Sequence, residues 1–163
     1  DLIERHVLEL RYFHFQRANE IRERKNYNTI CLIHFQLQNG NTIPVLHRSY
    51  YLESLPNGSI WLSLCTYTPY IETPTLTSGQ IVNNKNGKVV QQKEYQLYDN
   101  LLLSPREKEV LTLLAKGHSS KQIADILNIS TNTVYRHRQN ILSALQVSNT
   151  AAAIQVGFRL NII

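Results

Sequence analysis

Apolar residues in the first 24 positions recur at helical spacing. One stripe of the helical wheel holds Ile3, Val7, Leu10 and Ile21, with Phe13, His14 and Ala18 beside it. The opposite side holds Arg5, Arg11, Glu20, Arg22 and Glu23. Such a division between faces is typical of an amphipathic helix. The pattern predicts one long helix over residues 2–24, ended by the segment 26–28.

The next segment alternates with a period of two, which is typical of a half-buried strand. Cys31, Ile33, Phe35 and Leu37 are the apolar positions of this predicted strand, residues 29–37. Asn39-Gly40 is a strong hairpin signal, and the return strand is predicted over residues 42–53. Pro44 has no N–H to donate to a ladder, so we expect that strand to lie at an edge or to bulge.

A third strand is predicted over residues 59–67, after the turn at 56–58. A looser stretch with Pro69 and Pro74 follows, and residues 81–90 predict a small terminal hairpin around Asn86-Gly87. Six apolar strand residues fit either a ligand pocket or packing against the first helix: Ile33, Phe35, Leu37, Trp61, Leu62 and Leu64. Residues 1–95 are therefore predicted to form an α+β module, a long helix plus an antiparallel meander.

After a short linker at residues 96–101, the pattern returns to helical spacing with clear capping residues. Ser104, Pro105 and Glu107 predict a capping box, and the helix they begin is expected to stop at Gly117. Three further helices are predicted: residues 121–127 capped by Ser119 or Ser120, 131–145 capped by Ser130, and a last one from Asn149 or Thr150. Ala152, Ala153, Val156 and Leu160 are its candidate buried positions. Residues 102–163 are thus predicted to form an all-α four-helix domain with a helix-turn-helix.

Positive charge is concentrated in that helical domain. The chain of 163 residues has a formal net charge of +5 at pH 7. Residues 102–163 hold seven basic and three acidic side chains, a net charge of +4, which leaves +1 for residues 1–101. A basic segment next to a nearly neutral one suggests a polyanion-binding module attached to a second module.

Composition excludes several other classes of protein. Apolar residues make up 42% of the chain and charged residues 18%, an ordinary globular balance. No apolar run approaches the roughly 18 residues needed to span a bilayer, and no signal peptide is visible, so we expect a cytoplasmic protein without membrane contact. Cys31 and Cys65 are expected to be buried thiols in a reducing cytosol. The chain contains no Met, so we expect it to be a fragment of something longer.

The predicted helix 131–145 has one apolar and one polar face when about 100° is allowed for each residue. The inward face holds Val134, His137, Ile141, Leu142, Ala144 and Leu145. The outward face holds Tyr135, Arg136, Gln139, Asn140 and Ser143, and it carries no acid. Arg pairs with guanine and Gln with adenine in the major groove, and the N-terminal part of such a helix enters the groove first. The candidate base-reading residues are therefore Asn132, Tyr135, Arg136 and Gln139, with a merely solvated helix face as the alternative.

Phosphate contacts need short donors and cations around the same helix. Free backbone N–H groups of its first turn also point outward there. The candidate phosphate-binding residues are Lys121, Thr131, Thr133, Arg138 and Asn140. The alternative for each of them is an ordinary polar surface residue.

The sequence gives no support to catalysis, a cofactor or a metal site. Its histidines form no HxxxH or HExxH pair, and it contains no GxxxxGK[ST], GxGxxG or GxSxG motif. His137 points inward on the wheel and is expected to be a satisfied, partly buried side chain. We therefore expect no enzyme, no cofactor and no metal.

Four segments of the helical domain look like the LuxR-type (GerE) DNA-binding domain: residues 103–111 (LSPREKEVL), 115–124 (AKGHSSKQIA), 127–130 (LNIS) and 133–142 (TVYRHRQNIL). The resemblance implies that the base- and phosphate-contacting positions fall on Asn132, Tyr135, Arg136 and Gln139, with Lys121, Thr131 and Thr133 around them. Family members often carry Lys where this chain has Tyr135, which implies stacking or a hydroxyl hydrogen bond in place of a cationic contact. The resemblance also implies a homodimer contact through the fourth helix, residues 149–160.

Residues 1–95 resemble the C-terminal half of a PAS-like sensor domain in topology, without a diagnostic residue. This resemblance implies an incomplete module whose pocket is absent, is completed by other sequence or has no ligand. A small-molecule ligand and a protein partner therefore both stay open. The phospho-acceptor pattern of a receiver domain cannot be placed in the sequence.

Together these features favour a bacterial transcription regulator. It would bind double-stranded DNA as a dimer, read the major groove with residues 131–145, and be controlled by its N-terminal module. One alternative is a sigma-like subunit of RNA polymerase with a related helix-turn-helix, although sigma factors have further helices where this chain has strands. The other is a ligand-gated enzyme with a vestigial helix-turn-helix, for which no active-site residues are found.

Overall fold

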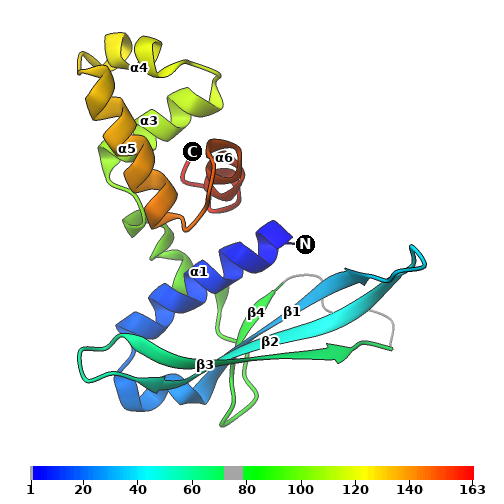
Figure 1. The fold of residues 1–163 in the computed structure, drawn as a ribbon. Coiled ribbons are helices and arrows are strands. Elements are labelled where there is room, and N and C mark those ends of the chain that lie inside the picture. The colour runs from blue at the N-terminus through cyan, green and yellow to red at the C-terminus, as the bar shows by residue number, and fades with distance from the viewer. Residues whose placement is uncertain (1, 72–78) are drawn as a thin grey trace. The chain divides into compact units, whose positions relative to one another are not determined.

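The computed structural model describes residues 2–71 and 79–163, and Figure 1 shows its fold. The chain forms two compact units, residues 1–95 and residues 96–163, called here the N-terminal and C-terminal units. An α+β unit followed by an all-helical one is the fold class that the sequence predicts. The part of the loose stretch that contains Pro74 lies outside the described residues.

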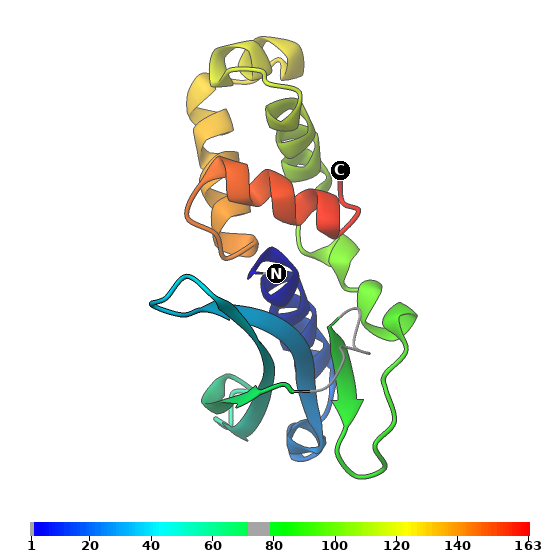
Figure 2. The same cartoon turned by 90° about the vertical axis from the view of Figure 1, so that its right-hand side faces the viewer.

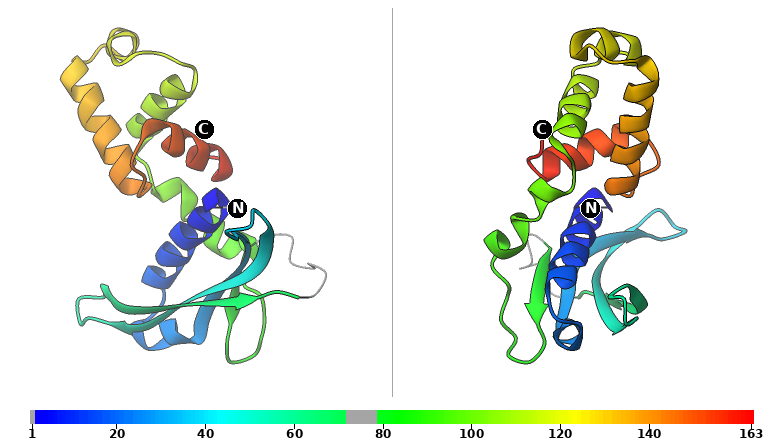
Figure 3. Two further views of the ribbon diagram at one scale, coloured as in Figure 1. Left: turned by 45° about the vertical axis from the view of Figure 1, so that its right-hand side comes forward. Right: turned by 90° about the vertical axis from the view of Figure 1, so that its left-hand side faces the viewer.

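The N-terminal unit is a helix on an antiparallel sheet. Helix α1 (Leu2–Ala18) lies on one face of the sheet, and the short 3-10 helix η1 (Ile21–Asn26) leads into the first strand (Figures 1 and 3). The strands are β1 (Tyr27–Gln36), β2 (Thr42–Ser54), β3 (Ile60–Pro69) and β4 (Gln80–Asn83). Their order in the sheet is β3-β2-β1-β4, and every pairing is antiparallel.

Two details of the predicted topology are wrong. The first helix ends at Ala18, because the side chain of Asn19 bonds back to the Phe15 carbonyl and the chain then tightens into η1. Ile21 is therefore 44% exposed and not part of the buried stripe, whereas Arg11 is buried. The strands also do not form a simple meander, since β4 pairs with β1 across the sheet and not with β3.

A polar network holds α1 to the sheet at its C-terminal half. The hydroxyl of Tyr12 donates to the Tyr27 carbonyl at 2.7 Å and accepts from Gln16 Nε2 at 2.7 Å. Gln16 Nε2 also donates to the Arg24 carbonyl at 2.8 Å. The side chains of Tyr12 and Gln16 are fully buried. The ring of Tyr12 lies 4.6 Å from that of Tyr51 on β2, and burial raises the pKa of Tyr12. The two hydrogen bonds of Nε2 offset part of the cost of burying Gln16 on the helix face that packs on the sheet, although its Oε1 has no hydrogen-bond partner in the described structure.

Two further expectations for the strands are wrong, and a third is met at a different position. β2 is an interior strand whose pairing with β3 is irregular at residues 51–54, not at Pro44. Pro44 lies opposite His34 near the beginning of β2, where its carbonyl accepts from the Tyr70 N–H. Cys31 is buried with its Sγ 3.6 Å from His47 Nδ1, but Cys65 is exposed. Of the six apolar strand residues only Ile33 is buried, and the others are at least 40% exposed: Phe35, Leu37, Trp61, Leu62 and Leu64.

The C-terminal unit consists of helices whose ends are set by local capping. Two short helices that the sequence did not predict come first: α2 (Gln92–Gln96), which lies almost entirely in the N-terminal unit, and η2 (Asp99–Leu101). The longer helices are α3 (Pro105–Ala115), α4 (Ser120–Leu127), α5 (Thr131–Ala144) and α6 (Thr150–Arg159). Ser104 and Ser130 are N-cap residues, as the sequence predicts. Where the sequence leaves two candidates open, the N-cap residues are Ser119 and Asn149. Helix α6 crosses α3 and α5 (Figure 2). The buried core is formed by Leu103, Val110, Leu111, Ile123, Val134, Ile141, Leu145, Val156 and Leu160.

Glu107 joins the cap of α3 to α5. Its carboxylate accepts from the Ser104 backbone N–H at 2.9 Å and from the Ser104 hydroxyl at 2.7 Å. Burial opposes ionisation of Glu107, but these hydrogen bonds, one from Asn140 and the nearby His137 outweigh it and hold the pKa below its usual 4.5. A carboxyl with a lowered pKa in the folded state stabilises that state above its unfolded pKa, and the contribution disappears as pH falls through the folded pKa.

We predict that Glu107→Gln makes the stability of the C-terminal unit less dependent on pH below about 4.5. The amide cannot ionise, so acid no longer removes a stabilising charge from the cap. Urea unfolding at pH 7, 4.5 and 3 followed by circular dichroism measures this. Asp125→Asn, an exposed carboxyl on α4, is the control. Equal pH dependence in Glu107→Gln and the wild type would show that the cap does not depend on the charge.

Candidate nucleic-acid interface

Helix α5 is fixed by its apolar face. Val134 is 0% exposed, Ile141 1% and the C-cap residue Leu145 0%, and α5 contacts α3, α4 and α6. Its first turn is capped by Ser130, whose hydroxyl accepts from the Thr133 N–H at 3.1 Å. Because the buried residues determine the rotation of the helix, they also determine which side chains face outward.

The four predicted base-reading residues lie together on the exposed side of α5. Asn132, Arg136 and Gln139 are exposed, and Tyr135 is 53% exposed. Asn140 and Ser143 extend the same side, and the sequence of α5 contains no Asp or Glu. The outward face therefore combines one cation with amide and hydroxyl groups, the side chains that pair with base edges in the major groove.

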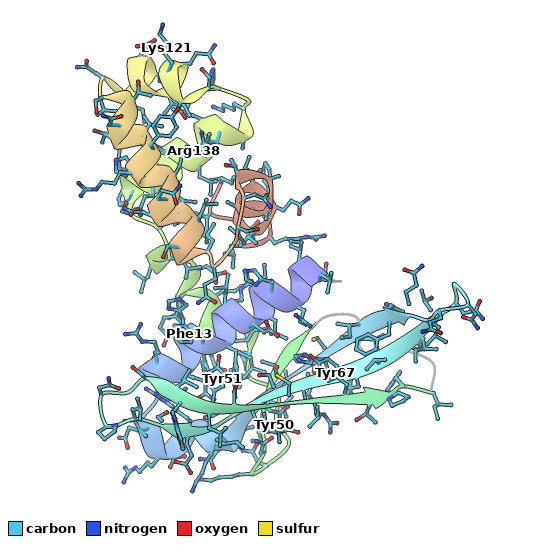
Figure 4. All side chains as sticks on the ribbon, in the orientation of Figure 1. Phe13, Tyr50, Tyr51, Tyr67, Lys121 and Arg138 are labelled. Atoms are coloured by element: carbon cyan, nitrogen blue, oxygen red, sulfur yellow. The ribbon has the colours of Figure 1, made fainter. Side chains whose placement is uncertain are left out.

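The predicted phosphate-binding residues differ in how freely they can reach a ligand. Lys121, at the start of α4, is exposed and forms no ion pair or hydrogen bond within the described part of the chain (labelled in Figure 4). Thr131 is half-buried, and Thr133 Oγ1 lies 2.8 Å from Ser130 Oγ. Asn140 hydrogen bonds to Glu107. Of these residues, Lys121 has the side chain most available to an anion.

Arg138, on α5 and labelled in Figure 4, is held by hydrogen bonds to two neighbouring helices of its own unit. Its Nη1 donates to Ser120 Oγ at 2.7 Å and its Nη2 to Thr150 Oγ1 at 3.0 Å, so the guanidinium links the first residues of α4 and α6. Its guanidinium carbon lies 6.0 Å from the centre of the Tyr135 ring. This link could not be predicted, because no pattern in the sequence brings residues 120, 138 and 150 together.

His137 differs from its expected state. It lies on the inner side of α5 and is half-buried, but its buried Nδ1 has no hydrogen-bond partner in the described structure. Among residues 2–71 and 79–163, no group of three His, Cys, Asp or Glu side chains is arranged to hold a metal ion. No helix in these same ranges is long and apolar enough to cross a membrane.

Helix α6 packs closely on α3 through a glycine. A Cβ atom at Gly157 would lie 3.0 Å from a side-chain carbon of Leu111 and 3.1 Å from one of Ile163. The same helix leaves Ala151, Gln155 and Phe158 exposed, and Phe158 is 57% exposed. A single exposed apolar side chain is common on protein surfaces, so the exposure of Phe158 makes it available to a partner but does not by itself define a contact.

Comparisons with known proteins identify the C-terminal unit. Residues 101–156 match the family model described as "Bacterial regulatory proteins, luxR family". The response regulator protein VraR of Staphylococcus aureus is 41% identical over 71 residues, which is 44% of this chain and 33% of VraR. The same protein of Staphylococcus epidermidis matches to the same extent. The chain thus spans about a third of the length of the curated relatives that it matches.

Solved structures give a weaker likeness over most of the chain. A Vibrio cholerae VqmA dimer in the absence of target DNA is 18% identical, has a TM-score of 0.37, and covers 92% of this chain and 62% of VqmA. A structure of VqmA bound to DPO is 15% identical and has a TM-score of 0.36. The match covers 92% of this chain and 59% of the VqmA chain. Because these TM-scores are low, the family assignment depends on the sequence matches, and the PAS-like character of the N-terminal unit stays a prediction. Residues 101–156 form a helix-turn-helix domain of the luxR family of bacterial regulatory proteins.

Proposed function

We propose that this chain is a sequence-specific transcription regulator that reads double-stranded DNA with α5. The observation that carries the proposal is the exposed, acid-free face of α5, where Arg136 and Gln139 lie beside Asn132 and Tyr135. A helix of this kind fits the major groove, and its cation and amides match base edges. The net charge of +4 on residues 102–163 favours approach to a polyanion.

The phosphate contacts that we propose lie around that face. Lys121 supplies a cation at the start of α4, and Thr131, Thr133 and Asn140 supply polar groups along α5. For Arg138 we propose a role other than a phosphate contact. Its two hydrogen bonds to Ser120 and Thr150 support a positioning role, in which the guanidinium sets α4 and α6 relative to α5.

We further propose that the protein binds DNA as a homodimer through α6, residues 149–160, and that the N-terminal unit controls it. The exposed Phe158 supports a contact with a second copy. A protein with this target would act in the cytoplasm and would not be an enzyme. No match supports the sigma-like alternative, and the family that is matched is one of regulatory proteins.

We predict that Arg136→Ala costs about 1–3 kcal/mol of binding free energy on the preferred site and removes the preference at one base pair. The guanidinium that pairs with a guanine is lost, while phosphate contacts remain. Selection of bound sequences from random DNA first defines the site, which we expect to contain two half-sites about one helical turn apart. Titration of that site and of unrelated DNA then measures the loss.

Lys116→Ala, which removes an exposed charge outside α5, is the control and should leave the preference unchanged. If Arg136→Ala weakens the selected site and unrelated DNA equally, Arg136 does not read a base. If selection enriches no sequence, the proposed function itself is wrong.

We predict that Arg138→Lys lowers affinity for the selected site roughly tenfold, because hydrogen bonds from a charged donor contribute about 1.5–3 kcal/mol and a Lys cannot bridge both hydroxyls. The variant keeps its charge, so the salt dependence of binding should not change. Ser120→Ala and Thr150→Val should each reproduce part of the loss without a change in charge. A phosphate contact would give the opposite pattern: near wild-type binding by Arg138→Lys, and a salt slope smaller by about 0.9 in Arg138→Gln.

We predict that Phe158→Asp converts the protein from a dimer to a monomer, because a carboxylate would be buried without a partner in the α6 contact. Light scattering after size-exclusion chromatography, with the wild type at the same concentration, measures the mass. Gln146→Glu introduces an exposed charge outside α6 and should leave the dimer intact. A Phe158→Asp dimer would place the contact elsewhere.

A further inference from the structure

The N-terminal unit contains a cleft that no part of the proposed DNA interface uses. It has a volume of about 420 Å³ and lies between the C-terminal half of α1, η1 and the turn that joins β2 to β3. Phe13, labelled in Figure 4, marks its α1 side. The residues that line it are Phe13, Arg17, Arg24, Asn57, Gly58, Ser59 and Ile60. Two of them are arginines and none is an acid.

Arg24 is a buried cation with only neutral partners. It is 5% exposed, and its Nη1 donates to the Gly58 carbonyl at 2.7 Å and to Ser54 Oγ at 3.1 Å. Its Nε donates to the Asn19 carbonyl at 3.4 Å. Within the described residues Nη2 has no acceptor and no carboxylate pairs with Arg24. Buried charges are normally paired with an opposite charge, so Arg24 lacks the partner expected for its burial.

Arg17 is a second cation in the lining of the same cleft, and its charge is not neutralised. Its guanidinium carbon lies 5.8 Å from the centre of the Phe13 ring, and the described structure gives it no ion pair. The acids of the neighbouring segment are engaged with other cations. Glu20 pairs with Arg22 at 2.7 Å, and Glu23 pairs with Lys85 at 3.3 Å.

The glycine in the β2–β3 turn keeps the buried guanidinium accessible. Gly58 has a φ of +83°, and a Cβ atom there would lie 3.8 Å from Arg24 Nη2. A longer side chain at this position would extend over the one nitrogen of Arg24 that has no acceptor. The turn therefore leaves Nη2 uncovered on the side of the cleft.

We propose that this cleft binds a small molecule that carries an oxyanion, a carboxylate or a phosphate group. The oxyanion would lie between Arg17 and Arg24, whose planar guanidinium groups suit such groups. The apolar part of the molecule would contact Phe13 and Ile60, which provide the apolar side chains of the lining. This ligand class rests on the proposed control by the N-terminal unit and makes it more specific. Binding of the ligand can be tested without DNA, so the ligand proposal and the DNA-binding proposal can fail independently.

Titration of the full chain with benzoate and with phenyl phosphate tests the proposal, and benzyl alcohol serves as the uncharged control of the same shape. We expect saturable shifts of the backbone amide signals of Gly58 and Ser59 in NMR spectra with the anions, and none with benzyl alcohol. The two anions distinguish a carboxylate site from a phosphate site by their relative affinities.

Charge reversal at the edge of the cleft supplies the matched variants. Arg17→Glu should weaken binding of both anions about tenfold or more, because attraction becomes repulsion. Lys88→Glu makes the same charge change at an exposed residue of the N-terminal unit outside the cleft and should weaken binding by less than about twofold. Arg17 is exposed, so its variant should fold, and circular dichroism verifies this.

Three results would overturn the proposal: no shift with either anion, equal shifts with benzyl alcohol, or equal losses in Arg17→Glu and Lys88→Glu. A loss confined to Arg17→Glu supports it. Arg24→Lys adds a second test at the buried position, where the wild-type fold in circular dichroism together with about tenfold weaker binding would be further support.

Discussion

The burial of one side of α5 is the constraint on which the candidate interface depends. Val134 and Ile141 are almost fully buried. A rotation of α5 would expose their apolar surface to water, which costs about 25 cal/mol of free energy for each Å² exposed. Since the outward residues are on the same helix, this packing also determines where Arg136 and Gln139 lie. The polar side of α5 needs no interactions of its own to stay in place, and its side chains remain available for a partner. The interface is thus a consequence of the core behind it.

Arg138 adds a second constraint that acts between helices. Capping fixes where α4 and α6 begin, but it does not fix how they lie relative to α5. The guanidinium of Arg138 reaches Ser120 and Thr150, the first residues of those two helices, and so links α4 and α5 to α6. This link adds to the direct packing of α6 on α3 and α5. This coupling is local, because residues 120, 138 and 150 all belong to the C-terminal unit.

The sequence predicts the C-terminal unit much better than the N-terminal one, and the reason is the range of the interactions. The caps at Ser104 and Ser130 bond to residues three positions away, so they can be recognised from spacing. The pairing of β4 with β1 joins residues about 50 positions apart, and nothing local encodes it. Likewise, the hydrogen bonds of the buried Gln16 side chain join it to Tyr12 and to the distant Arg24 carbonyl, and the exposure of Cys65 on β3 cannot be recognised from the local pattern. In the site, helical spacing predicted which residues of α5 face outward. It could not predict that Arg138 already forms hydrogen bonds to Ser120 and Thr150.

Arg138 and Arg24 show how burial decides the role of a guanidinium. Both donate to neutral oxygen atoms and both hold segments of their unit together. Arg138 is only half-buried, so water screens its charge and two hydroxyl acceptors are sufficient. Arg24 is 5% exposed, and the same kind of neutral acceptor leaves its charge without compensation. The uncompensated charge of Arg24 therefore supports the proposal that the cleft beside it accommodates an anion.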